Sequence, residues 1–281
     1  MHCHHLILII LSIEFAKVIL ADILYPTDNA VFDAERLKDI AVLELGSGTG
    51  VLGVLLAPCV GNYVLTDLPE LVPLMEKNIN YNFPEHRSGV LEPAKIMRSI
   101  PGRPPKSRKL RMKPSATPTK AGKALNIAAQ PLDWVDIAST PAGSSARSRA
   151  CSHIRRLAQK EGTDCPSFDL ILAVDTLYNT ALTAPFLAVL DEFASKGNVT
   201  PEGSEVPLST LVIIICELRD EDVLRGFLES WLNVPGWEIW RLGGTGAERE
   251  ADDNDITGMA FMQGPFVVWA GWKIIKDSRL Q

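Results

Sequence analysis

The sequence predicts an α/β protein built on a doubly wound, mostly parallel sheet of seven strands, with the last strand antiparallel. From Ala41 onward, apolar runs alternate with helix-like segments, a pattern typical of βαβ units. The first runs are apolar at nearly every position, as strands covered on both faces must be. The last two runs are separated only by a polar loop, which predicts a closing antiparallel hairpin.

Each candidate strand is a run rich in β-branched or aliphatic residues. In chain order the runs are AVLEL at 41–45, NYVLT at 62–66, ALNIAAQPL at 124–132, FDLILAV at 168–174, STLVIIICEL at 209–218, WEIWRL at 237–242 and FVVWAGWKII at 266–275. The helix-like segments between them span 50–58, 68–81, 180–195 and 220–233. Together these elements predict one domain over residues 41–281.

Two polar stretches interrupt this pattern. Residues 84–123 are rich in Pro, Ser, Lys and Arg, and ten basic residues from Lys95 to Lys123 face no acidic one. This composition predicts a disordered basic insertion, either a solvated linker or a tether for an RNA-rich or acidic partner such as a ribosome. Residues 138–166 are rich in Ser and Arg and predict a polar loop.

The N-terminal segment, residues 1–40, is atypical and predicts a truncated or altered start. Its apolar run at 6–13 lacks the basic residues before it and the small residues after it that a secretory signal requires. Glu14, Lys17 and Asp22 interrupt the apolar residues too early for a membrane-spanning helix. We expect residues 1–25 to form a helix packed on the domain, or to derive from a mis-predicted exon.

Charge and cysteine content exclude some classes of function. The net charge of −6 provides no overall attraction to nucleic acid. Five cysteines are scattered without a CxxC pair, which argues against a zinc site or a disulfide framework and for reduced, intracellular thiols. We therefore expect a cytoplasmic protein with no metal site, no membrane segment and no nucleic-acid specificity.

The stretch AVLELGSGTGVLGVLLA at 41–57 combines a strand, a glycine turn and a helix, the usual cradle for a nucleotide-like ligand. A triphosphate is excluded, because Gly50 is not followed by the lysine of a Walker loop. A dinucleotide stays open, since Gly48 begins a GxGxxG motif and Asp67 follows at the ribose-binding spacing. Glu44 favours S-adenosylmethionine instead, because a carboxylate suits an ammonium and a sulfonium better than a diphosphate.

Four motifs, VLELGSGTGVLG, LTDLPELVPLMEKNINYN, LDW and FDLILAVDTLYN, resemble in this order the seven-strand, Rossmann-like S-adenosylmethionine-dependent methyltransferases. DTLY resembles the lysine-methylating branch, which carries an Asp/Glu-x-x-Tyr motif after the fourth strand. LYNTALTAPFLAVL, CELRDEDVLRGFLESWL and GWEIWRL are similar to the fungal ribosomal lysine N-methyltransferase 5 group. The resemblance covers residues 41–83 and 124–275, and the N-terminal Gly-aromatic motif of that branch is not found in residues 1–40.

The resemblance implies a site for the cofactor. The glycine loop would line its methionine portion, Asp67 would hold the ribose hydroxyls and Leu68 would pack on the adenine. Asp133 and Trp134 would flank the adenine, and Ala173 would close the floor under the sulfonium. The cofactor-binding residues implied are Glu44, Gly46, Ser47, Gly48, Gly50, Asp67, Leu68, Asp133, Trp134 and Ala173.

The catalytic pair that the resemblance implies is Asp175 and Tyr178. Methyl transfer to lysine needs a neutral amine, whose pKa falls on desolvation beside a positive sulfonium. Asp175 would accept a hydrogen bond from this amine, and Tyr178 would form a wall of the channel. Taken alone, Asp175 also suits a helix N-cap and Tyr178 a core aromatic. Glu217 suits either the pocket border or an ion pair with Arg219.

The resemblance therefore implies a monomeric protein-lysine N-methyltransferase that uses S-adenosylmethionine and acts on a ribosomal protein of the large subunit. Three alternatives stay open at this point. They are a cofactor-binding protein with impaired catalysis, a methyltransferase with a small-molecule substrate and, more remotely, a NAD-dependent oxidoreductase.

Overall fold

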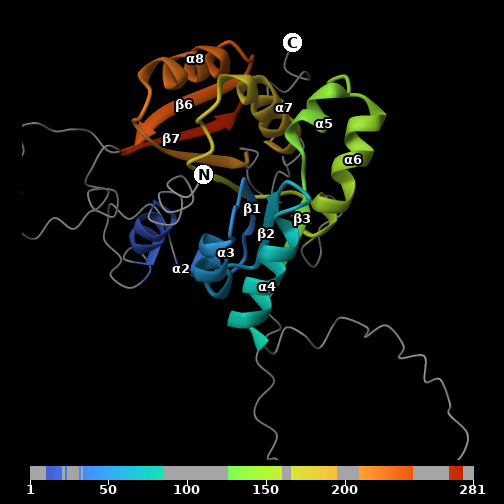
Figure 1. Ribbon diagram of the computed structural model, residues 1–281, viewed down its shortest axis with the longest axis vertical. Coiled ribbons are helices and arrows are strands. Elements are labelled where there is room, and N and C mark those ends of the chain that lie inside the picture. Colours follow the sequence, from blue (N-terminus) through green and yellow to red (C-terminus); the bar gives the residue numbers. More distant parts are fainter. Residues whose placement is uncertain are drawn as a thin grey trace, which may run out of the picture.

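The computed structural model describes residues 11–20, 23, 32, 34–84, 126–159, 166–194, 209–242 and 266–274. Within these ranges the chain forms a seven-stranded sheet in the order β3-β2-β1-β4-β5-β7-β6, with helices on both faces (Figure 1). The strands are β1 (Ala41–Leu45), β2 (Asn62–Asp67), β3 (Ile127–Pro131), β4 (Leu170–Val174), β5 (Leu211–Glu217), β6 (Trp237–Leu242) and β7 (Phe266–Lys273).

The direction of the strands confirms the predicted sheet. Neighbouring strands from β3 to β5 pair in parallel, whereas β7 pairs antiparallel with both β5 and β6. The predicted hairpin of the last two strands is therefore confirmed, and its second strand lies between β5 and β6. All five residues of β1 and all five of β4 are buried, which accounts for sequences that are apolar at every position except Glu44.

Two hydrophobic clusters hold the helices against the sheet. One face carries residues 11–20, α2 (Ala34–Leu37), α3 (Val51–Leu56) and α4 (Val72–Asn82). The other carries α5 (Trp134–Ser139), α6 (Ser145–Arg156), α7 (Thr183–Ala194) and α8 (Glu221–Leu232). Short 3-10 helices, η1 (Ala57–Cys59) and η3 (Thr180–Leu182), follow α3 and precede α7. This arrangement is the predicted doubly wound fold.

The helix α6 corrects the prediction of a polar loop at 138–166. Ser144 begins the helix, because its hydroxyl accepts a hydrogen bond from the backbone N–H of Arg147. Cys151 and Ile154, three residues apart, are fully buried in the cluster beneath. Arg155 is buried too, since its guanidinium binds Glu192 of α7. Because arginine is usually exposed, the sequence of this helix indicated a solvent-exposed segment.

The N-terminal helix packs against the domain, as expected. Residues 11–20 are helical, and Leu11, Phe15 and Ile19 repeat every four residues within one hydrophobic cluster. None of the helices in the described ranges has the length and hydrophobicity needed to cross a membrane. The predicted basic insertion at 84–123 lies, apart from its first residue, outside the described residues.

The strand order also fixes where a ligand site can form. After β1, the chain continues through β2 and β3 toward one edge of the sheet and then returns to place β4 on the other side of β1. The loops after β1 and β4 therefore diverge at the carboxyl ends of adjacent strands, and ligands of open α/β sheets bind at such a point.

Candidate functional site

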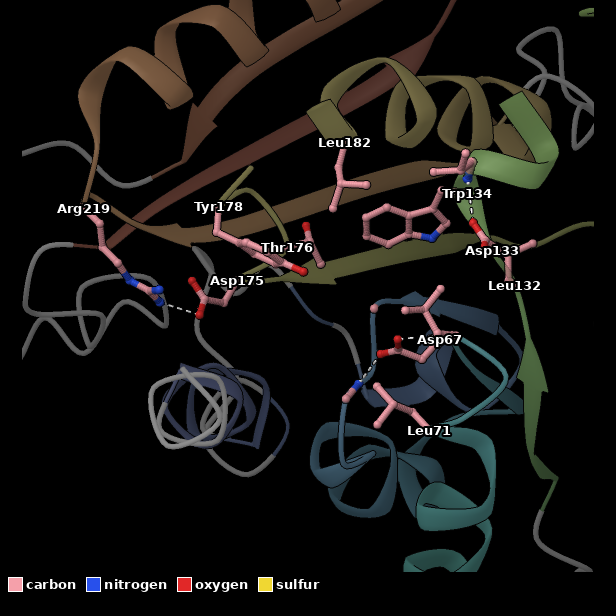
Figure 2. Close-up of a pocket in the computed structure, with 14 residues that line it drawn as sticks. Asp67, Leu71, Leu132, Asp133, Trp134, Asp175, Thr176, Tyr178, Leu182 and Arg219 are labelled. Carbon is pink, nitrogen blue, oxygen red and sulfur yellow. Dashed lines mark hydrogen bonds and ion pairs between the residues drawn. The ribbon is translucent and has the colours of Figure 1, made fainter. Parts of the chain in front are cut away.

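A cavity of about 540 Å³ opens at the carboxyl ends of β1 to β5 (Figure 2). This volume lies within the range of about 300–1,000 Å³ that is usual for small-molecule and cofactor sites. Its lining is mostly apolar with a few convergent polar groups. The lining residues are Gly46, Gly48, Asp67, Leu68, Leu71, Leu132, Asp133, Trp134, Val135, Asp175, Thr176, Tyr178, Leu182 and Arg219.

The loop after β1 is shaped by three glycines in the left-handed region, with φ of 70° at Gly46, 55° at Gly48 and 75° at Gly50. Residues with a Cβ rarely adopt this conformation, so the sequence of alternating glycines is what allows the turn. Gly46 and Gly48 line the cavity. Gly50 is the N-cap of α3 and faces the core, since a Cβ added to it would lie 3.4 Å from Leu65 and Met75.

Asp67 connects the end of β2 to this loop. Its Oδ2 accepts a hydrogen bond of 2.7 Å from the backbone N–H of Gly48, and its Oδ1 accepts one of 2.7 Å from that of Leu68. Both bonds go to the negative carboxylate and are therefore of the stronger, charge-assisted kind. They hold the carboxylate of Asp67 at the cavity wall, as Figure 2 shows.

Glu44 lies beneath the loop rather than in the cavity lining. Its side chain, 2% exposed, accepts a hydrogen bond of 2.8 Å from the hydroxyl of Tyr63. Burial raises the pKa of Glu44 to about 8, so the side chain is mostly uncharged at neutral pH. The sequence argument placed a charged carboxylate beside the ligand; in the chain without ligand, Glu44 lies outside the lining of the cavity and its pKa is raised.

Two further residues implied by the resemblance also lie outside the cavity lining. Ser47 is buried, and its hydroxyl donates to the carbonyl oxygen of Glu44 at 3.3 Å and accepts from the N–H of Thr66 at 3.0 Å. Ala173 is fully buried in the core of the sheet. Both support the lining from beneath and do not form its surface.

Asp133 and Trp134 follow β3 and form the opposite wall. The Asp133 carboxylate caps α5 by accepting from the backbone N–H of Val135 at 2.8 Å and more weakly from that of Asp136. Trp134 packs against Phe186 of α7, with ring centroids 5.1 Å apart. The cap and this ring contact together fix the indole at the cavity wall, so Trp134 serves both the core and the cavity.

Asp175 and Tyr178 lie on the loop after β4. Asp175 has φ of 54°, the only positive value at a non-glycine position among the described residues. Its carboxylate forms an ion pair with Arg219, which follows β5, and Figure 2 shows this pair at one side of the cavity. Tyr178 is 62% exposed and is therefore not a core aromatic. The N-cap after β4 is Asn179, so Asp175 does not have that role.

Arg219 joins two acidic side chains at this end of the cavity. Its Nε donates to Oε2 of Glu217 at 2.6 Å, which is the ion pair considered from the sequence. Burial lowers the pKa of Arg219, but the bonds to Glu217 and Asp175 outweigh burial and raise it. Beneath this group, burial and the charge of Asp175 raise the pKa of the Cys216 thiol to about 12, so Cys216 stays a neutral thiol.

The cavity therefore brings together eight of the residues proposed from the sequence, namely Gly46, Gly48, Asp67, Leu68, Asp133, Trp134, Asp175 and Tyr178. Sequence reasoning missed six others, namely Leu71, Leu132, Val135, Thr176, Leu182 and Arg219. Three of the missed residues, Leu132, Val135 and Thr176, are direct neighbours of a proposed residue, so their place after a strand was the available signal. Leu182 carries no such signal, because it enters the cavity from η3.

Comparison with known proteins shows which proteins this chain is similar to. Residues 9–93 match the family described as lysine methyltransferase. Ribosomal lysine N-methyltransferase 5 of Zygosaccharomyces rouxii is 28% identical over 193 residues, which are 68% of this chain and 50% of that protein. EEF1A lysine methyltransferase 3 of Xenopus tropicalis is 40% identical over 53 residues, which are 18% of this chain and 24% of that protein.

The chain thus spans about half the length of the Zygosaccharomyces relative. Among solved structures, magnesium protoporphyrin IX methyltransferase from Synechocystis, with bound S-adenosylmethionine, superimposes with a TM-score of 0.41 at 12% identity, covering 94% of this chain and 78% of that one. The sequence matches confirm the predicted resemblance to lysine methyltransferases.

Proposed function

We propose that this chain, similar to lysine methyltransferases, is itself a protein-lysine N-methyltransferase that uses S-adenosylmethionine. The observation that carries the proposal is that one cavity holds two sets of groups. Asp67 and Trp134 lie on one side, where a nucleoside would be bound, and Asp175 and Tyr178 lie on the other, where an amine would be received. A binding site and a reaction site within one cavity are what a group transfer requires.

The residues present fit the cofactor. A Cβ on Gly46 would lie 2.8 Å from Cγ2 of Thr176, so only a residue without a side chain fits there unless Thr176 moves. Asp67 offers a fixed acceptor for ribose hydroxyls, and Trp134 offers an aromatic surface for a base. NAD would use the same acceptor, and since Glu44 lies outside the lining, binding measurements must separate the two cofactors.

When bound, S-adenosylmethionine supplies a methyl group on a sulfonium, which is an electrophile that needs little further activation. The work of the chain is then to present a neutral lysine amine. The apolar lining favours the neutral amine by desolvation. Asp175 accepts a hydrogen bond from this amine and orients it, and Tyr178 forms the wall through which the lysine chain enters.

The proposed substrate class follows from the relatives. One is named for a ribosomal lysine and the other for a lysine of EEF1A. We propose a ribosomal protein of the large subunit as the substrate, encountered in the cytoplasm by a monomeric enzyme. EEF1A is the second candidate, and it is carried only by the shorter match.

The test begins with calorimetric titrations of the full chain with S-adenosylmethionine and with NAD. We expect binding of the first alone, and binding of NAD alone would overturn the proposed cofactor. Methyl incorporation from labelled S-adenosylmethionine is then measured with ribosomal large subunits and with purified EEF1A. Label in a lysine of the ribosomal fraction is the expected result, and label in EEF1A only would move the assignment to that substrate.

The role of Asp175 is tested with Asp175→Asn, because asparagine tolerates a positive φ and retains the shape of the side chain. We expect a loss of methyl transfer of about 100-fold or more, as for other groups that orient a reacting atom. Binding of S-adenosylmethionine should change little. Asp222→Asn, at an exposed ion pair of α8, is the matched control. Unchanged methylation by Asp175→Asn would refute the assigned role.

A further inference from the structure

Thr176 is the buried polar residue that the site leaves unexplained. It follows Asp175 after β4, lines the cavity and is 4% exposed. Its hydroxyl oxygen has no hydrogen-bond partner among the residues that the structure describes. A buried hydroxyl without a partner is unfavourable, and native proteins generally avoid it. The structure therefore raises the question of what satisfies this group.

The hydroxyls of the other buried threonines in the described ranges are hydrogen-bonded, as is usual for buried polar groups. The Thr66 hydroxyl donates to the carbonyl oxygen of Glu44 at 2.6 Å, and the Thr210 hydroxyl donates to that of Phe168 at 2.7 Å. Neither residue lines the cavity. The buried threonine whose hydroxyl lacks a partner is thus also the one at the ligand site.

The position of Thr176 places its side chain on the cofactor side of the cavity. Its methyl carbon lies 2.8 Å from the point where a Cβ on Gly46 would be, and two ring carbons of Trp134 lie 3.4 Å from the same point. Thr176, Gly46 and Trp134 therefore meet at one place in the wall. Figure 2 shows Thr176 between Trp134 and Tyr178.

We propose that the Thr176 hydroxyl is a hydrogen-bonding contact for the cofactor in this cavity, satisfied only when a ligand of the S-adenosylmethionine type is bound. This inference rests on the proposed function and adds a residue to its binding site. A threonine hydroxyl both donates and accepts, so it can serve either kind of polar group on the ligand. The oxygen exposes almost no surface in the structure without ligand, so the contact requires the Thr176 side chain to turn about its Cα–Cβ bond on binding.

The test compares Thr176→Val with Thr210→Val in the full chain. Both changes replace a hydroxyl by a methyl group of similar size. Without ligand, Thr176→Val should raise the urea midpoint, since it removes an unsatisfied group, whereas Thr210→Val should lower it by breaking a bond. In calorimetric titrations with S-adenosylhomocysteine, Thr176→Val should raise Kd about 10-fold, corresponding to one good hydrogen bond. Thr210→Val should leave Kd unchanged.

A second variant separates the hydroxyl from the methyl group. Thr176→Ser keeps the hydroxyl, so its Kd should stay within about threefold of the wild-type value. If the wild-type chain binds S-adenosylhomocysteine and Thr176→Val binds it equally well, the contact is absent while the proposed function stands. If the wild-type chain binds neither S-adenosylhomocysteine nor S-adenosylmethionine, the proposed function and this contact fail together.

Discussion

Replacing Gly46 by alanine tests how tightly the glycine loop is packed against the residues after β4. Two separate costs are expected. Gly46 has φ of 70°, which is unfavourable for any residue with a Cβ. The new methyl group would also lie 2.8 Å from Cγ2 of Thr176 and 3.4 Å from the ring of Trp134. The first distance is shorter than a van der Waals contact, so one of the two groups must move.

The magnitudes follow from these two costs. The left-handed conformation costs an L-residue about 1–2 kcal/mol. Overpacking in a well-filled site costs about 1–3 kcal/mol more. Gly143, before α6, has the same φ of 70° but no atom within 4 Å of an added Cβ. Gly143→Ala should therefore show the backbone cost alone, and the difference between the two variants measures the steric clash.

Urea denaturation followed by circular dichroism gives the free energy of unfolding of each variant. The double variant Gly46→Ala, Thr176→Ser lacks the clashing methyl carbon of residue 176, so it should recover most of the steric cost. Equal losses of stability in Gly46→Ala and Gly143→Ala would refute the steric part of the reasoning. So would a double variant whose stability is the simple sum of the single changes.

Four other substitutions probe the fold by urea denaturation. Because burial raises the pKa of Glu44 to about 8, the folded chain holds a proton that the unfolded chain releases. The free energy of unfolding should fall from about pH 5 to pH 8, by at most about 1.4 kcal/mol per pH unit, and Glu44→Gln should remove this slope. Arg155→Met should cost about 3–5 kcal/mol, because it breaks the buried ion pair with Glu192; a loss below 1 kcal/mol would contradict this. Gly226→Ala should add about 0.5–1 kcal/mol of stability, since the helical site is open. Gly271→Ala should instead destabilise, because the new Cβ would meet Trp231 at 2.5 Å.

The fold could be predicted because its signals are local. The run 170–174 is apolar at every position, the run 41–45 at every position but Glu44, and glycines follow directly after the first strand. The helix α6 could not be predicted this way, because what buries Arg155 is a carboxylate on α7, far away in the sequence. Only the folded chain shows that this polar segment has a buried face.

Some residues of the candidate site could likewise be predicted from the sequence, and others could not. Residues at a strand's end or just past it, such as Asp67 and Asp175, line the cavity, since there the backbone leaves the sheet. Glu44 and Ala173 lie within their strands, where side chains point to the faces of the sheet and not to its end. Predicting that Arg219 lines the cavity required the order of the strands, because β5 lies beside β4 only in the folded sheet.

The pairing of Asp175 with Arg219 bears on how a lysine would be activated. An isolated carboxylate beside an amine stabilises the ammonium form and raises the pKa of the amine, which opposes nucleophilic attack. In this chain Arg219 offsets part of the charge of Asp175, but it also pairs with Glu217, so the three groups together keep one negative charge. The positive φ of Asp175 costs about 1–3 kcal/mol, and such strain persists where surrounding contacts hold it. Here the N–H of Asp175 bonds to the carbonyl oxygen of Ile215 at 2.7 Å while its carboxylate holds Arg219. On the proposed function, Asp175 can orient an amine by a hydrogen bond, and the ion pair with Arg219 weakens its tendency to retain that amine as an ammonium ion.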